Sequence, residues 1–129
     1  MATEQQVFSE HSVEFGKYDK TFWNWSGDNS LVPAGKTLVI TTLTLNYFPA
    51  LGGKVGRADV AGRIGGSGAV GTGNAVWRLQ IIYVEPNKTV HLTFPGGLSL
   101  HAGGHVEIGF VTDGPGTIFV SANGKLISP

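Results

Sequence analysis

Two histidines and one glutamate could form a small polar cluster. His91 lies in segment 89–94 (TVHLTF), and His105 and Glu107 lie in segment 105–110 (HVEIGF). In both segments the polar residues alternate with apolar ones, so we expect all three side chains to face outward from half-buried strands. If the two strands were neighbours, two imidazoles and a carboxylate would approach one another.

Three chemical interpretations of this cluster remain open. Two imidazoles and a carboxylate can bind a metal ion. Histidine can also make a subunit contact sensitive to pH, and a cross-strand pair of His91 with Glu107 is an ordinary surface feature. We predict a polar cluster that lines an interface, with no metal.

Two tryptophans two positions apart form a second candidate site. Trp23 and Trp25 share the same parity, so they fall on one face of a strand. Exposed indoles would make a flat platform for sugar rings, to which Asp28 and Asn29 in the following loop could add polar contacts. Buried indoles would anchor the core or a subunit interface, where tryptophan is enriched. We favour the core or interface and keep a carbohydrate-binding site as the alternative.

The remaining motifs do not indicate an enzyme. The chain contains no cysteine and no serine in a GxSxG turn, and the spacing of its acids singles out no catalytic pair. The sequence GSGAVG at 66–71 fits a dinucleotide-binding pattern, but a strand-like segment follows it where a helix is required. We therefore predict no catalytic residue and no cofactor.

The elements that position these residues are strands. Apolar residues alternate with polar ones, and one face is expected to carry Trp77, Leu79, Ile81 and Tyr83. Glycine and proline mark turns between these segments, including 95–97 and Asn123-Gly124. The predicted strands are 5–15, 20–26, 36–47, 55–63, 75–84, 88–94, 105–112 and 117–122, with a short ninth at 125–127.

About eight short strands indicate an all-β fold. We predict a single domain over 1–129, an antiparallel β-sandwich of the jelly-roll type, with an immunoglobulin-like sandwich as the runner-up. The apolar parity switches between Ile40 and Leu43, which suggests a β-bulge near Thr41.

Two segments do not fit the simple strand pattern. Residues 1–15 could be an N-terminal arm that pairs with a neighbouring subunit, or the first strand of their own sheet. Residues 51–75 contain a dense run of glycines and are predicted to form a long loop. That loop is either ordered by a partner or an ordinary surface loop.

The chain is poor in charge. Only 14% of its residues are charged, against about 25% in a typical domain, and the nine positive and nine negative residues cancel. Proteins that remain apart from their neighbours usually keep a net charge, so we predict a surface occupied by copies of this chain or by another structural protein.

These features together predict a self-associating structural protein. We expect a virion decoration or tail-associated protein, as a homotrimer in contact with a capsid or tail component. The balanced charge argues against a nucleic-acid partner. No apolar run would span a membrane and no signal peptide is seen, so we expect location in a virion or otherwise in the cytoplasm, with a glycan as the alternative ligand.

Overall fold

The computed structural model describes the chain except for residues 1–2, 16–19, 25–30, 51–55, 68–70 and 112–115. The described residues form eight strands, and none of them belongs to a helix long and apolar enough to cross a membrane. The strands are β1 (Thr3–Phe15), β2 (Lys20–Asn24), β3 (Thr37–Pro49), β4 (Gly56–Ile64), β5 (Asn74–Val84), β6 (Thr89–His101), β7 (His105–Val111) and β8 (Gly116–Ser128).

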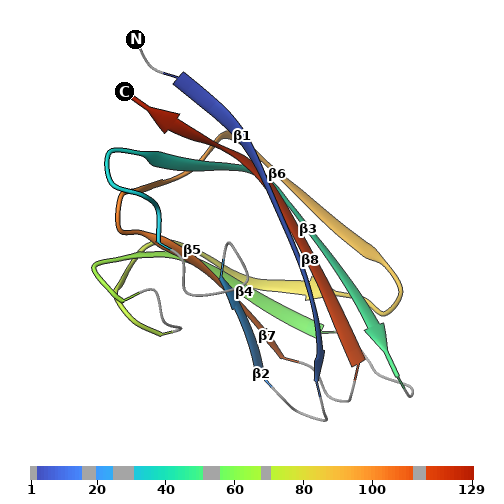
Figure 1. Ribbon diagram of the computed structural model, residues 1–129. Helices are drawn as coiled ribbons and strands as arrows, with labels where there is room; N and C mark the ends of the chain where they lie inside the picture. The colour runs from blue at the N-terminus through green and yellow to red at the C-terminus, as the bar shows by residue number, and fades with distance from the viewer. Residues whose placement is uncertain (1–2, 16–19, 25–30, 51–55, 68–70, 112–115) are drawn as a thin grey trace.

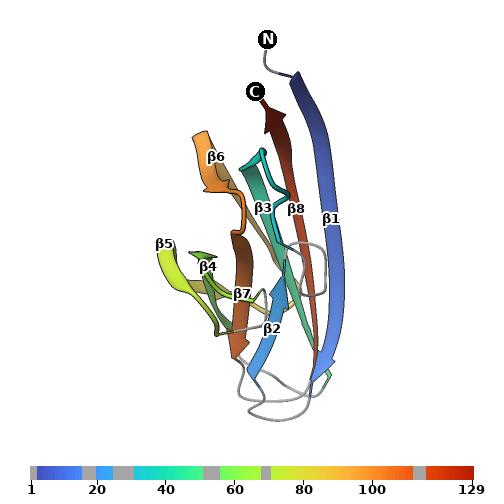
Figure 2. The same cartoon turned by 60° about the vertical axis from the view of Figure 1, so that its left-hand side comes forward.

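The strands make two antiparallel sheets that face each other (Figures 1 and 2). Sheet A has the order β1-β8-β3-β6, and sheet B has the order β2-β7-β4-β5. Strand β1 pairs with β8, β2 with β7, β3 with β6 and β4 with β5. The chain therefore behaves as one long hairpin, with its tip at β4–β5, that is wrapped into two layers.

This strand order confirms the predicted jelly-roll sandwich. Only one pair of consecutive strands, β4 and β5, lies side by side within a sheet, whereas the immunoglobulin arrangement has several such pairs. The runner-up was therefore wrong. Residues 3–15 form the first strand of their own sheet, which is the simpler of the two alternatives for this segment.

The core lies between the sheets and depends on β3. Leu38, Ile40, Leu43, Leu45 and Tyr47 are all buried, so the inward parity changes between residues 40 and 43. Thr41 is an extra residue relative to β8, because Ile40 pairs with Gly124 and Thr42 with Asn123, and the register with β6 is interrupted at the same point. The predicted bulge is confirmed, and it keeps apolar side chains inward along all of β3.

Two predicted turns are parts of continuous strands. Residues 94–97 of β6 lie opposite the bulge of β3, and Gly96 and Gly97 adopt the positive φ angles that this wide irregularity requires. The strand then continues to His101. Asn123-Gly124 was predicted as a hairpin turn, but it lies inside β8, and no separate ninth strand exists there.

Residues 51–75 are not a single loop. Strand β4 occupies Gly56–Ile64, and a shorter connection at 65–73, the β4–β5 loop, joins it to β5. Strand β5 also departs from the simple pattern. Its register shifts opposite residues 58–60, so Trp77 and Leu79 pack against the core while Tyr83 is 61% exposed.

Two aromatic contacts join the sheets. The rings of Tyr47 in β3 and Phe110 in β7 meet edge to face, with centroids 5.6 Å apart. At the side of the sandwich, the Trp77 indole in β5 donates a hydrogen bond of 3.0 Å to the Ser99 carbonyl in β6. Strand β5 is the end strand of sheet B and β6 is the end strand of sheet A, so Trp77 packs against the core at this edge of the sandwich.

We expect Gly124→Ala to lower the free energy of unfolding by about 2 kcal/mol, as overpacking of a tight core site does. A methyl group on Gly124 would collide with the Val39 carbonyl oxygen, which belongs to the backbone of β3 beside the bulge and cannot rotate away. Urea denaturation measures this change. Ser121→Ala, three residues earlier in β8, is the control and should change stability by less than about 0.5 kcal/mol. Equal effects of the two substitutions would contradict the close approach.

Candidate protein-binding interface

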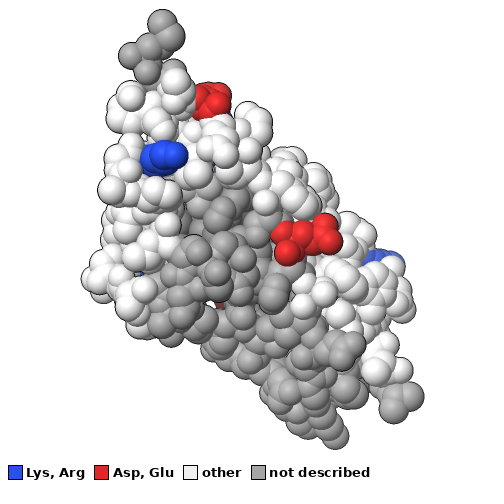
Figure 3. Space-filling view, viewed as in Figure 1, with Lys and Arg blue, Asp and Glu red and all other residues white. Residues whose placement is uncertain are grey.

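The outward side chains of sheet A form a broad face with little charge. We call it the A face, and among its described side chains only Glu4, Glu10 and Lys125 are charged. Among the described residues on the side of the molecule drawn in Figure 3, charged groups are sparse. The A face comprises Glu4, Gln6, Phe8, Glu10 and Ser12 of β1, Thr117, Phe119, Ser121, Asn123, Lys125 and Ile127 of β8, Thr37, Thr42, Thr44, Asn46 and Phe48 of β3, and Thr89, His91, Thr93, Ser99 and His101 of β6.

Neutral hydrogen bonds link the strands across the A face. The Asn123 amide donates to the Thr42 hydroxyl over 3.0 Å, and the Thr44 hydroxyl lies 2.7 Å from Nδ1 of His91. The Thr89 hydroxyl donates to the side-chain carbonyl of Asn46. These bonds restrict the side chains before any partner arrives, which lowers the entropy cost of covering them.

Exposed phenylalanines add apolar area to the same face. Phe8 is 61% exposed, Phe48 is 43% and Phe119 is 39%. The rings of Phe48 and Phe119 pack edge to face with centroids 5.5 Å apart. Beside Phe119, a groove of about 220 Å³ is lined by Glu10, Asn46, Val120 and Ser121. Aromatic side chains on a surface of low charge are typical of the centre of a protein interface.

The predicted cluster of His91, His105 and Glu107 does not form. His91 is exposed on β6 in sheet A, whereas His105 and Glu107 belong to β7 in sheet B. The prediction that all three face solvent was also wrong, since His105 is 1% and Glu107 is 5% exposed. His105 and Glu107 do lie on the outer side of β7, as the alternation predicts, but other parts of the chain cover that side.

The cover includes the β4–β5 loop and an arginine. The Glu107 carboxylate accepts hydrogen bonds from the Gly71 backbone amide at 2.6 Å, from Nε of Arg63 at 3.0 Å and from Nε2 of His105 at 2.9 Å. Arg63 also donates to the Gly73 carbonyl over 3.2 Å. One buried carboxylate therefore holds both the arginine and the returning end of the loop against sheet B.

This Glu107 cluster, made of Arg63, His105 and Glu107, fits a structural role. Both carboxylate oxygens are engaged by chain donors, and no group of three His, Cys, Asp or Glu residues able to hold a metal occurs among the described residues. Nδ1 of His105 is buried without a hydrogen-bond partner in the described part of the chain. The charges of Arg63 and Glu107 are satisfied mainly by each other and by the backbone of the β4–β5 loop.

The tryptophan site stays a prediction. The backbone of Trp23 pairs with Ile108 of β7, and its side chain lies outside the described residues. Trp25, Asp28 and Asn29 lie outside them too.

The exposed Lys88 lies at the turn between β5 and β6, where a hydrogen bond to Glu85 raises the pKa of its ammonium above the ordinary value.

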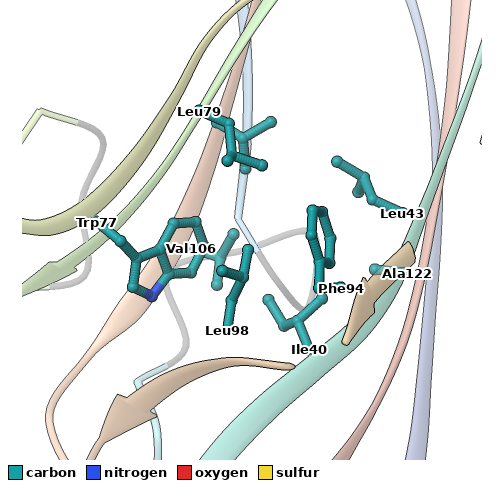
Figure 4. Close-up of a pocket in the computed structure, with 9 residues that line it drawn as sticks. Ile40, Leu43, Trp77, Leu79, Phe94, Leu98, Val106 and Ala122 are labelled. Atoms are coloured by element: carbon teal, nitrogen blue, oxygen red, sulfur yellow. The ribbon is translucent and has the colours of Figure 1, made fainter. Parts of the chain in front are cut away.

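One apolar pocket lies between the sheets, and Figure 4 shows its lining. It is enclosed by side chains from both sheets, among them Leu43, Trp77 and Phe94, but its volume is only about 10 Å³. Binding sites for small molecules measure roughly 300–1,000 Å³, so this space is a gap in the packing.

The sequence analysis did not single out Phe8, Phe48 or Phe119 of the A face as candidate site residues. The available signal was the outward parity of each residue in its strand.

Comparison with known proteins gives a likeness of fold. No protein-family model and no curated protein matches the chain. Among solved structures it is similar to the T13 viral particle of infectious bursal disease virus, with 8% identity and a TM-score of 0.48 over 98% of this chain and 35% of that chain. It is also similar to the VP2 subviral particle of the same virus, with 9% identity and a TM-score of 0.46 over 98% of this chain and 36% of that chain.

A cellular protein has a similar arrangement. The cupin domain of Drosophila melanogaster CENP-C is 13% identical with a TM-score of 0.34, over 86% of this chain and 57% of that chain. The chain spans little more than a third of the viral proteins and less than two thirds of the CENP-C chain. At these identities the likeness concerns the fold alone.

We expect Glu107→Ala to lower the free energy of unfolding by about 3 kcal/mol, because it leaves the largely buried Arg63 without its counter-charge and frees the Gly71 amide. Urea denaturation measures the loss. Glu85→Ala removes an exposed glutamate that pairs with Lys88, and this control should cost less than about 1 kcal/mol. If the two variants are equally stable, the Glu107 cluster does not hold the loop.

Proposed function

We propose that this chain is a structural protein that associates with copies of itself. The observation that carries the proposal is the A face, where exposed phenylalanines stand among hydroxyl, amide and imidazole groups and few of the described side chains are charged. Such a composition is typical of interface centres, which are depleted in charge and enriched in aromatic residues.

The chain-wide charge supports the same proposal. A net charge of zero with 14% charged residues gives little electrostatic repulsion between copies. The role we propose is non-enzymatic, and the buried carboxylate of Glu107 supports this because its contacts are with chain donors that fix a loop.

The specific form we propose is a subunit of a protein shell. We place the chain in a virion, as a decoration or tail-associated protein in contact with a capsid or tail component, and we favour a homotrimer. Small size, a jelly-roll sandwich and a weakly charged surface suit a subunit whose neighbours cover much of its area.

The test is the solution mass of the purified chain, measured by light scattering over a concentration series. We expect a species larger than 13.6 kDa for the wild type and a mass shifted toward the monomer for Phe119→Lys, because the substitution puts a charge in the A face. Association should weaken roughly tenfold or more, as for a hot-spot residue.

Tyr83→Lys is the matched control. Tyr83 is an exposed aromatic residue on β5 in sheet B, so the same substitution there should leave the mass unchanged. A wild-type chain that stays monomeric up to high micromolar concentration would sink the proposal. Acrylamide quenching of tryptophan fluorescence that a member of a glycan panel reduces would then move the carbohydrate-binding alternative forward.

A further inference from the structure

We propose that two copies of this chain pack A face to A face about a two-fold axis that runs parallel to the strands. The inference rests on the proposed self-association and adds a contact that pairs two copies through the A face, so that a homotrimer would have to form through another surface. Rotation about such an axis lays β1 of one copy over β6 of the other, and β8 over β3, because the sheet order is reversed across the contact.

The register of sheet A supplies the reason for this axis. Two cross-strand rows of outward residues end in a glutamate on β1 and in a histidine on β6. The first row comprises Glu10, Ser121, Thr44 and His91, and the second comprises Glu4, Ile127, Thr37 and His101. Both rows therefore carry an acid at one edge of the sheet and an imidazole at the other.

A two-fold axis parallel to the strands keeps each row at its own level and reverses its direction. Glu10 then faces His91 of the partner subunit, and His91 faces the partner's Glu10, so that each contact contains this pair twice. Sheets that pack face to face keep their strands within about 30° of one another, which preserves the pairing of levels.

The two side chains are prepared for such a bond. The Thr44 hydroxyl lies 2.7 Å from Nδ1 of His91, and when it donates there, the ring proton stays on Nε2 and can be donated to a carboxylate. Glu10 makes no ion pair within the described part of the chain. It borders the groove of about 220 Å³ beside Phe119, which has room for an imidazole.

The size of the face also matches a second copy. The four strands of sheet A have 13 residues each. At a rise of ~3.3 Å per residue and a strand spacing of ~4.8 Å, they cover roughly 800 Å². A stable interface buries about 800 Å² on each partner, so one A face is sufficient for one specific contact.

The first experiment exchanges the charges of the pair. We expect H91E to raise the dissociation constant at least ~tenfold, because Glu10 of the partner subunit would face a second carboxylate. E10K removes the acceptor and should also weaken the contact. In the double variant E10K/H91E the pair is restored with reversed sign, and the dissociation constant should return close to the wild-type value.

The matched control makes the same exchange outside the A face. Lys88 and Glu85 form an ion pair of 2.9 Å at the turn between β5 and β6, and both are exposed. K88E and E85K/K88E should leave the dissociation constant unchanged. Thermal unfolding of every variant identifies any that fails to fold.

A second experiment uses the absence of cysteine from the chain. Glu10 and His91 lie on opposite edges of sheet A, three strand spacings or roughly 14 Å apart. Sheets packed face to face lie about 10 Å apart, so residue 10 of one copy lies nearer to residue 91 of the partner subunit than to residue 91 of its own copy. A bifunctional maleimide with a spacer of about 10 Å, too short for the roughly 14 Å within one copy, should give covalent dimers of E10C/H91C and none of E10C or H91C alone.

The outcomes separate the two proposals. A wild-type chain that never associates overturns both of them. A wild-type chain that associates, but whose mass does not respond to H91E or is not restored in E10K/H91E, overturns the two-fold contact and leaves self-association through another surface. Cross-linking of E10C alone would place β1 over β1 and would overturn the proposed axis.

Discussion

The extra residue Thr41 is the constraint to which the rest of sheet A adapts. In a strand with a strict period of two, alternate residues face opposite sides of the sheet, so Leu43 and Leu45 could not face the core together with Leu38 and Ile40. The bulge lets Leu38 and Ile40 on one side, and Leu43 and Leu45 on the other, all face inward. Both neighbours of β3 adjust to it, β6 with four residues opposite the bulge and β8 with a glycine that lets the backbones approach.

The alternation of the sequence was sufficient to predict most of the fold. All eight strands begin within two residues of their predicted positions because turn residues flank clear apolar and polar alternation, and the bulge was visible as a change of parity. The signals that misled were glycines inside strands. Gly96, Gly97 and Gly124 were interpreted as reversals, whereas they serve a wide bulge and a close backbone contact, which depend on neighbours far away in the sequence.

The candidate site was less predictable for the same reason. The outward parity of Glu107 was correct, but parity alone does not show whether the outer side of a strand meets water or another segment. The β4–β5 loop returns over sheet B and converts a surface carboxylate into a buried one. Conversely, Phe8, Phe48 and Phe119 look like core residues by type, although their outward parity agrees with the register, which places them on the outside of sheet A.

The nested pairing of strands also sets the order in which the molecule can be completed. The tip pair, β4 and β5, is separated by a short loop, whereas β1 pairs with β8, the last of the described strands. Contacts between distant segments form slowly, because a long loop must close before they repay its entropy. During synthesis, β1 therefore remains an unpaired edge until β8 has been made, and folding within a crowded cell depends on protecting it.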